Sequence, residues 1–300
     1  MDELMIGAWT PLLGGRGATL AVANEYTAAA ELARLTVWAD ERRIAQVEAA
    51  TPAPRRPRIS GGRVLWGDGV MELATGYYQR VEAVAAAIVE GTDAPQTPTP
   101  FGGYRAATYA WSDDGQALVI SAAWTGPPGP PPARVVLVDG SGHHQATLWQ
   151  ESDLAPTAAW VGCNVIVVGT REPRVYDRAG SNLIILSTGT PAVRINASVD
   201  ETRLLVVEHG RLTVWDIERW TTVGVWTGTW LDAALTPDGR TVVAVGLNGH
   251  LYLARVENGL SLARELSLPD QVRGIALGCN RIVAAFASGD AVRTAPFQGS

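Results

Sequence analysis

Lysine is absent from the 300-residue chain, whose 24 basic residues are all arginines. Mechanisms that depend on a lysine nucleophile, a Schiff base or a phosphate-gripping lysine are therefore excluded. Two cysteines are too few for a disulfide-rich framework. The sequence also contains neither a Gly-rich phosphate loop with lysine nor a Gly-x-Ser-x-Gly nucleophile turn. With no catalytic motif to support an enzyme, we expect a non-enzymatic protein.

Long apolar runs are lacking too. The best candidate, residues 81–89, is interrupted by Glu82 and is shorter than the roughly 18 residues that a membrane-spanning helix requires. The first five residues, Met1–Met5, include two acids and no basic residue, so no signal peptide is visible. We therefore expect a cytoplasmic protein that does not bind membranes.

The net charge of -6 argues against binding to nucleic acid, which usually requires a basic surface. Local basic spots occur at Arg42–Arg43, at Arg55–Arg56 and at Arg58. Their neighbouring prolines and loop residues favour an interpretation as solvated loop charges. No nucleic-acid partner is expected.

Hydrophobic residues make up 47% of the chain and charged residues only 18%, so the chain can bury a large core. Its 32 glycines and 18 prolines supply the turns that many short strands require. The composition therefore favours an all-β fold over long helices.

A repeated unit explains the length. The pentapeptide Arg-Leu-Thr-Val-Trp occurs at residues 34–38 and again at 211–215, and Gly-Cys-Asn occurs at 162–164 and 278–280. A tight turn followed by an apolar run recurs seven times, at intervals of about 42 residues, which is typical of the four-stranded blades of a β-propeller. The sequence therefore predicts one propeller domain over residues 1–300. Its blades would start near residues 12, 58, 104, 156, 193, 230 and 272.

The predicted third strands end in a recurring pair. These endings are Trp215-Asp216, Tyr176-Asp177 and Val138-Asp139, with a looser version at residues 38–40. From about Gly14 to Gln298 the chain resembles the WD-repeat family of propellers, although the Gly-His dipeptide often found before the first strand is missing. The resemblance implies a seven-bladed β-propeller of four-stranded antiparallel blades, closed by the N-terminal strand, in which residues 4–10 complete the last blade. It also resembles the stand-alone bacterial propellers encoded beside von Willebrand A and AAA-type ATPase partners.

One segment departs from the repeat. Residues 79–90 place Val81, Val84, Ala85, Ile88 and Val89 at helix spacing, where a propeller requires an outer strand. We leave both a short helix and a strand open for this segment.

Tryptophan and cysteine have predicted places in the blades. We expect Trp66, Trp160, Trp215 and Trp230 to fill the core, and the two cysteines, which occupy equivalent positions in units four and seven, to be buried and unpaired.

The four histidines do not predict a metal site. His143 and His144 are adjacent in a turn and would point in opposite directions. His209 and His250 lie in equivalent hairpins and could share a ligand, but exposed turn residues are the simpler expectation. We predict no cofactor and no metal.

Propeller loops carry function on a rigid scaffold. We expect the hairpins between second and third strands to share one face and to bind a protein partner, since interfaces favour tryptophan, tyrosine and arginine. The function we predict is a non-catalytic interaction scaffold in a bacterial multi-protein system, and the alternative is a propeller hydrolase or lyase with a metal or carboxylate site at the channel mouth. The predicted partner-binding residues are Tyr26, Trp124, Arg171, Glu172, His209, Asn248 and Asp290.

Overall fold

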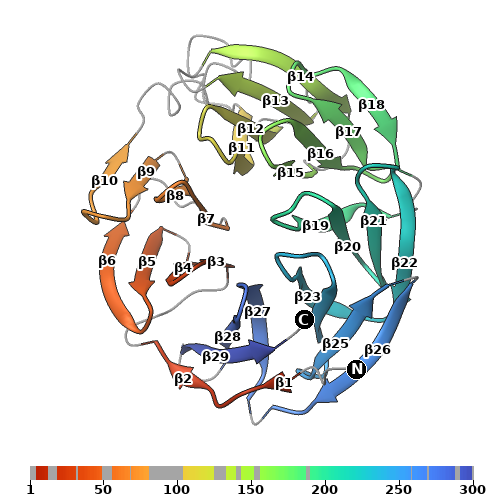
Figure 1. Ribbon diagram of the computed structural model, residues 1–300. Coiled ribbons are helices and arrows are strands. Elements are labelled where there is room, and N and C mark those ends of the chain that lie inside the picture. Colours follow the sequence, from red (N-terminus) through yellow and green to blue (C-terminus); the bar gives the residue numbers. More distant parts are fainter. Residues whose placement is uncertain are drawn as a thin grey trace. The chain divides into compact units, whose positions relative to one another are not determined.

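All secondary structure in the described part of the chain is β-strand (Figure 1). No helix among these residues is long and apolar enough to cross a membrane. The computed structural model describes residues 5–12, 19–31, 33–48, 56–67, 69–80, 104–124, 133–139, 143–151, 156–186, 190–257, 259–268, 270–287 and 291–298.

The strands form seven antiparallel sheets, so the predicted seven-bladed β-propeller of four-stranded blades is confirmed. Blades 1 to 6 have four strands each, and blade 7 has three strands completed by two short N-terminal ones. Blade 1 is β3 (Thr19–Ala23), β4 (Tyr26–Glu31), β5 (Arg34–Ala39) and β6 (Arg42–Glu48); blade 2 is β7 (Arg58–Ser60), β8 (Arg63–Trp66), β9 (Gly69–Glu72) and β10 (Tyr78–Arg80). Blade 3 is β11 (Tyr104–Trp111), β12 (Ala117–Trp124), β13 (Ala133–Asp139) and β14 (His144–Glu151); blade 4 is β15 (Thr157–Val161), β16 (Val165–Gly169), β17 (Arg174–Asp177) and β18 (Asn182–Ile185). Blade 5 is β19 (Ala192–Ala197), β20 (Arg203–Glu208), β21 (Arg211–Asp216) and β22 (Thr221–Thr227); blade 6 is β23 (Trp230–Leu235), β24 (Thr241–Gly246), β25 (Leu251–Val256) and β26 (Leu260–Leu266). Blade 7 is β27 (Val272–Leu277), β28 (Arg281–Phe286) and β29 (Val292–Gln298), with β1 (Met5–Ile6) and β2 (Thr10–Pro11) on β29.

The chain divides into two compact units. The first comprises residues 1–66, 71–78 and 196–300, and the second comprises residues 67–70 and 79–195. The first unit therefore holds blades 1, 6 and 7 and most of blades 2 and 5, and the second holds blades 3 and 4. A single domain over residues 1–300 stays a prediction.

Blade 1 begins later than expected. The run after the predicted turn at residues 15–17 forms β3, which is the first strand of its blade and starts at Thr19 rather than near residue 12. Asn24, with a φ of 50°, makes the turn to the second strand β4. Short polar side chains such as asparagine tolerate this left-handed conformation. In the segment for which both a helix and a strand were left open, Gln79 and Arg80 belong to β10, and residues 81–90 lie outside the described part of the chain.

Apolar side chains from neighbouring blades form the core within each unit. In the first unit, buried residues of β20 and β21 pack with those of β23 and β24, and the series continues from blade 6 to blade 7 and from blade 7 to blade 1. In the second unit, blades 3 and 4 share a core that contains Trp160. Every residue of β24 is buried, as expected of a strand with packed side chains on both faces. Burial of one such Val or Leu contributes about 1.5–3 kcal/mol.

Most of the tryptophan predictions are confirmed, whereas the predicted burial of the cysteines is wrong. Trp66, Trp160 and Trp215 are buried, and Trp230 is partly buried against the core of blades 5 and 6. Both cysteines are unpaired, but Cys163 is half-buried and Cys279 is exposed. Each lies in the turn between the first two strands of its blade, where its side chain is outside the packed strands.

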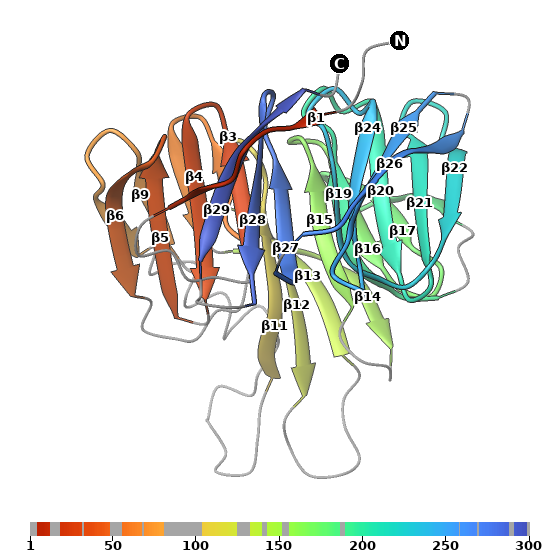
Figure 2. The ribbon, with the colours of Figure 1, turned by 90° about the horizontal axis from the view of Figure 1, so that it is seen from below.

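The N-terminal segment pairs with the last strand of the chain. Met5 and Ile6 pair with Gln298 and Phe297, and the short strand β2 pairs with Thr294 and Arg293. Figure 2 shows β1 running beside β29. This pairing supplies the outer strand of blade 7 and covers an edge that would otherwise offer unpaired backbone groups.

Candidate functional site

Each blade has two ends with different connections. We call the end at which the second and third strands are joined the hairpin end, and the opposite end the turn end. His209 lies between β20 and β21 and Asn248 between β24 and β25, both exposed at the hairpin ends of blades 5 and 6. Arg171 and Glu172 occupy the same connection in blade 4 and are also exposed.

The remaining predicted residues have other placements. Tyr26 begins β4 and follows the connection between the first and second strands, so it belongs to the turn end of blade 1, contrary to prediction. The cause is the shifted start of blade 1. Trp124 is the last residue of β12, and Asp290 lies outside the described residues.

The hairpin end of blade 6 exposes two leucines. Trp230 pairs with Gly246, and the next register pair is Asp232 with Val245, which leaves Leu231 as the extra residue of a β-bulge. Leu231 is 46% exposed, and Leu247, beside Gly246, is 57% exposed. A bulge redirects a side chain, and here it accompanies an apolar side chain that faces solvent.

A continuous polar network lies beside these leucines. Asn248 Nδ2 donates to Tyr252 Oη over 2.7 Å, and His250 Nδ1 lies 2.6 Å from Glu265 Oε1. Ser267 Oγ lies 3.1 Å from His250 Nε2. Hydrogen bonds from His250 and Tyr252 lower the pKa of Glu265, so its carboxylate is ionised at neutral pH.

Three aromatic rings border the network. The centroids of Trp226 and Trp230 lie 4.6 Å apart, and Tyr252 meets Trp230 edge-on at 5.5 Å. His250 continues this contact, with its ring 6.4 Å from that of Tyr252. Aromatic pairs in such geometries contribute roughly 0.5–1.5 kcal/mol beyond their burial. These rings hold the hairpin end of blade 6 against the outer strand of blade 5.

Sequence reasoning missed a charged cluster on the inner strands of the first unit. Arg56 Nη2 donates to the Ile275 carbonyl over 2.8 Å and lies 3.6 Å from Asp232 Oδ2. That same oxygen accepts the Ile275 N–H, while Asp232 Oδ1 accepts the Ala233 N–H. Asn196 extends the series by donating to the Ala233 carbonyl. In the sequence, the one indication of this cluster was Asp232, an acidic residue inside an otherwise apolar strand.

Burial lowers the pKa of Arg56 to about 9, and the guanidinium therefore remains charged at neutral pH. Its charge is met by Asp232, and its hydrogen bond reaches the backbone of β27. These contacts connect the residues before β7 to the first strands of blades 6 and 7. They hold the inner strands in place and give Arg56 a structural role instead of the predicted solvated one.

At the turn end, three blades repeat one hydrogen-bonded turn. The hydroxyl of Ser112, Ser198 or Thr236 donates to the aspartate two residues later, over 2.6, 2.5 and 2.6 Å. The same hydroxyl accepts the backbone N–H five residues later. Side chains of this kind satisfy turn backbone groups that would otherwise lack partners.

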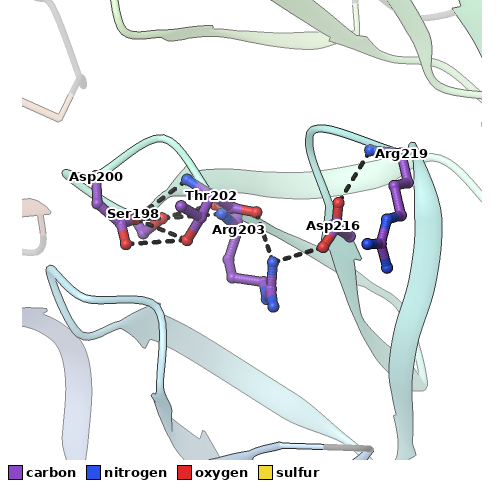
Figure 3. Close-up of polar contacts among 6 residues, drawn as sticks. All are labelled: Ser198, Asp200, Thr202, Arg203, Asp216 and Arg219. Atoms are coloured by element: carbon purple, nitrogen blue, oxygen red, sulfur yellow. Dashed lines mark hydrogen bonds and ion pairs between the residues drawn. The ribbon is translucent and has the colours of Figure 1, made fainter.

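Blade 5 adds an ion pair to this turn (Figure 3). Arg203 Nη1 donates to Asp216 Oδ2 over 2.7 Å, and Asp216 Oδ1 accepts the Arg219 N–H. Partial burial alone would raise the pKa of Asp200, but hydrogen bonds from Ser198 and Thr202 outweigh it and lower that pKa. The turn-end acids in Figure 3 are therefore engaged in holding the blade together. The hairpin end of blade 6 is the stronger candidate for binding.

Among the described residues, no group of three or more His, Cys, Asp or Glu side chains lies in a position to hold a metal ion. His209 and His250 belong to adjacent hairpin ends as expected, but His250 is engaged by Glu265 and Ser267.

Comparison with known proteins bears on the fold. No protein-family model and no curated protein matches the sequence. Among solved structures, the chain is similar to one in the crystal structure of a mitotic checkpoint complex, with a TM-score of 0.67 and 13% identity. The match covers 96% of this chain and 90% of the other. At that identity, the likeness supports the seven-bladed β-propeller fold.

Proposed function

We propose that this protein is an interaction scaffold whose binding function is non-catalytic and which binds a protein partner through the hairpin end of blade 6. The observation that carries the proposal is the pair of exposed leucines, Leu231 and Leu247, beside the exposed Asn248. Apolar anchors next to polar rim residues are the usual composition of a protein interface.

Neighbouring positions extend this surface. The corresponding bulge of β27, between Val272 and Gly274, leaves Arg273 exposed, and His209 lies exposed at the hairpin end of blade 5. Arginine is favoured at interfaces because its planar guanidinium can stack and form several hydrogen bonds. The solved structure with a similar fold comes from a multi-protein complex, which agrees with a protein partner.

The finer parts of the proposal concern the partner and its setting. We propose a cytoplasmic bacterial protein of WD-repeat type, in a system with an ATPase or a von Willebrand A-domain partner, that binds neither nucleic acid nor membranes. A hydrolase or lyase site at the channel mouth is not proposed, because Asp232, the acid on the inner strands described above, is engaged by Arg56 and by two backbone N–H groups.

The test is a differential pull-down from the native host. We expect the double variant Leu231→Ser/Leu247→Ser to lose a partner that the unchanged protein retains, with a loss of at least tenfold, since truncation of central anchors costs more than about 1.4 kcal/mol. Because both side chains are exposed, circular dichroism and thermal unfolding should be unchanged.

The matched control is Val225→Ser/Leu262→Ser, which removes two equally exposed apolar side chains from the outer strands β22 and β26. It should retain the partner. A partner that survives the leucine double variant, or is lost equally from the control, would place the interface elsewhere.

A further inference from the structure

We infer that Ser267 is an activated nucleophile, which accepts an acyl group from an ester with His250 as its base and Glu265 as the positioning residue. The inference goes beyond the scaffold function and does not depend on it. It rests on the connected hydrogen bonds of Ser267, His250 and Glu265.

The backbone register brings the three side chains together. Leu251 pairs with Leu266 and Tyr252 with Glu265, so His250 stands opposite Ser267 at the end of β25 and β26. Alternate residues of a strand point to one face, which places Glu265 and Ser267 on the same side of the blade. The arrangement is therefore built from two paired strands.

The ionised carboxylate decides the tautomer of His250. Glu265 Oε1 can only accept a hydrogen, so Nδ1, 2.6 Å away, carries the proton. In the neutral imidazole Nε2 then has a free lone pair, and Ser267 Oγ, 3.1 Å away, is the donor. A hydroxyl that donates to a fixed imidazole nitrogen, with a carboxylate on the other nitrogen, is the arrangement of an activated serine.

The carboxylate is held from a second side. A hydrogen bond from Tyr252 helps to lower the pKa of Glu265, and the Tyr252 hydroxyl in turn accepts a hydrogen bond from Asn248. The imidazole is consequently oriented before any substrate arrives, which is the purpose of supporting contacts around a reactive group.

Access and neighbouring surface indicate the kind of electrophile. Ser267 is exposed, and about a third of the His250 side chain is accessible. The ring of Tyr252 adjoins the imidazole, and Trp226 and Trp230 pack against Tyr252, so that the three rings offer an apolar contact. An ester with an aromatic or other apolar group fits this surface.

The reaction balances without another reactant than water. Ser267 Oγ forms a bond to the acyl carbon as its proton moves to His250 Nε2, and the bond from carbon to the leaving oxygen breaks. That oxygen takes the proton from the imidazolium, so His250 returns to the neutral state. Water, deprotonated by the same nitrogen, can then hydrolyse the acyl-serine.

The probe is p-nitrophenyl acetate. It suits this chain because the chain contains no lysine side chains, which the probe would otherwise acetylate. We expect release of p-nitrophenolate and an acetyl group on Ser267, located by mass spectrometry of the full-length protein after digestion. Acetylation there should fall about a hundredfold in His250→Gln, and the adduct at this position should be absent in Ser267→Ala.

Two further variants separate activation from structure. Glu265→Gln should slow acetylation of Ser267 while leaving thermal unfolding unchanged, since the side chain is 46% exposed. The control variant Ser261→Ala removes an exposed serine from β26. In this variant Ser267 should be acetylated at the original rate. The inference is overturned if Ser267 reacts no faster than Ser261 in the unchanged protein, or equally fast in His250→Gln. Neither result depends on partner binding.

Discussion

Asp114 illustrates how a single side chain stabilises the turn end of a blade. It accepts hydrogen bonds from Ser112, from the Gln116 N–H and from Arg178, whose guanidinium also donates to the Cys163 carbonyl of the next blade. Partial burial alone would raise the pKa of Asp114, but these hydrogen bonds outweigh it and hold the pKa at about 2. One carboxylate therefore joins blades 3 and 4.

This shift gives stability a defined pH dependence. The pKa of Asp114 in the folded protein lies below its usual value near 3.8. Its contribution to the free energy of unfolding is therefore present above pH 4 and disappears as the pH falls toward 2. We expect Asp114→Asn to lower the free energy of unfolding at pH 7 by about 1 kcal/mol, discounted for the exposed third of the side chain.

Urea unfolding at several pH values provides the measurement. The difference between Asp114→Asn and the unchanged protein should shrink between pH 4 and pH 2. The control Glu218→Gln removes an exposed carboxylate from the connection between β21 and β22. Its difference in stability from the unchanged protein should not vary over this pH range. A constant difference across this pH range would contradict the prediction.

Among the elements, β22 depends on a glycine. A Cβ on Gly224 would lie 2.5 Å from the Leu260 nitrogen and 3.0 Å from the Gly259 carbonyl carbon, both backbone atoms of the adjoining blade. An open strand would gain about 0.5–1 kcal/mol from a change of glycine to alanine. At Gly224 the close backbone contact makes the same change destabilising.

We therefore expect Gly224→Ala to lower the free energy of unfolding by about 1–3 kcal/mol, because overpacking forces the backbones of β22 and β26 apart. Chemical denaturation measures the change. Val225→Ala, the next residue on the same strand and exposed, should alter stability by less than about 0.5 kcal/mol. Stabilisation by Gly224→Ala would show that the two strands can separate without cost.

Elements also show where prediction from sequence succeeds. In blades 2 to 7 the turn followed by an apolar run falls on the second strand, whereas the first strands of these blades begin at residues 58, 104, 157, 192, 230 and 272. Blade 1 failed because a glycine-rich turn signal precedes its first strand, while the actual turn relies on Asn24 in a positive-φ conformation. Sequence spacing alone does not distinguish these two turns.

The Ser267 site could not be predicted, for a reason of register. From the turn after β25, Val256 pairs with Leu260, and an unbroken ladder would place Leu266 opposite His250. A bulge between Leu253 and Ala254 shifts the register by one residue, and Ser267 takes that place. A one-residue shift exchanges the faces of a strand, and nothing in the local sequence fixes it.

For the whole molecule, the contacts between the N-terminal segment and blade 7 contribute to stability and cover the edge of β29. Leu12 is buried in the core of blades 7 and 1, and Trp9 packs edge-on against Phe286 at 5.4 Å. Deletion of residues 1–12 would remove this packing together with both strands on β29. We expect a lower unfolding midpoint and concentration-dependent association, because the exposed edge of β29 can pair with another chain.

Differential scanning calorimetry and light scattering test this expectation. Met5→Ala keeps the backbone pairing of β1 and removes only a side chain that is 45% exposed, so it should behave like the unchanged protein. A truncated chain that stays monodisperse with an unaltered midpoint would show that the terminal strands are dispensable.

The pairing of Met5 with Gln298 also sets an order of events during synthesis. Blades 1 to 6 take all their strands from consecutive stretches of chain, and each can form its sheet as it emerges from the ribosome. Blade 7 cannot, since β1 and β2 precede blades 1 to 6 in the chain whereas their partner β29 follows them. Its sheet is therefore completed only after β29 has been made, and a ribosome that stalls before β29 leaves β1 and β2 without their partner.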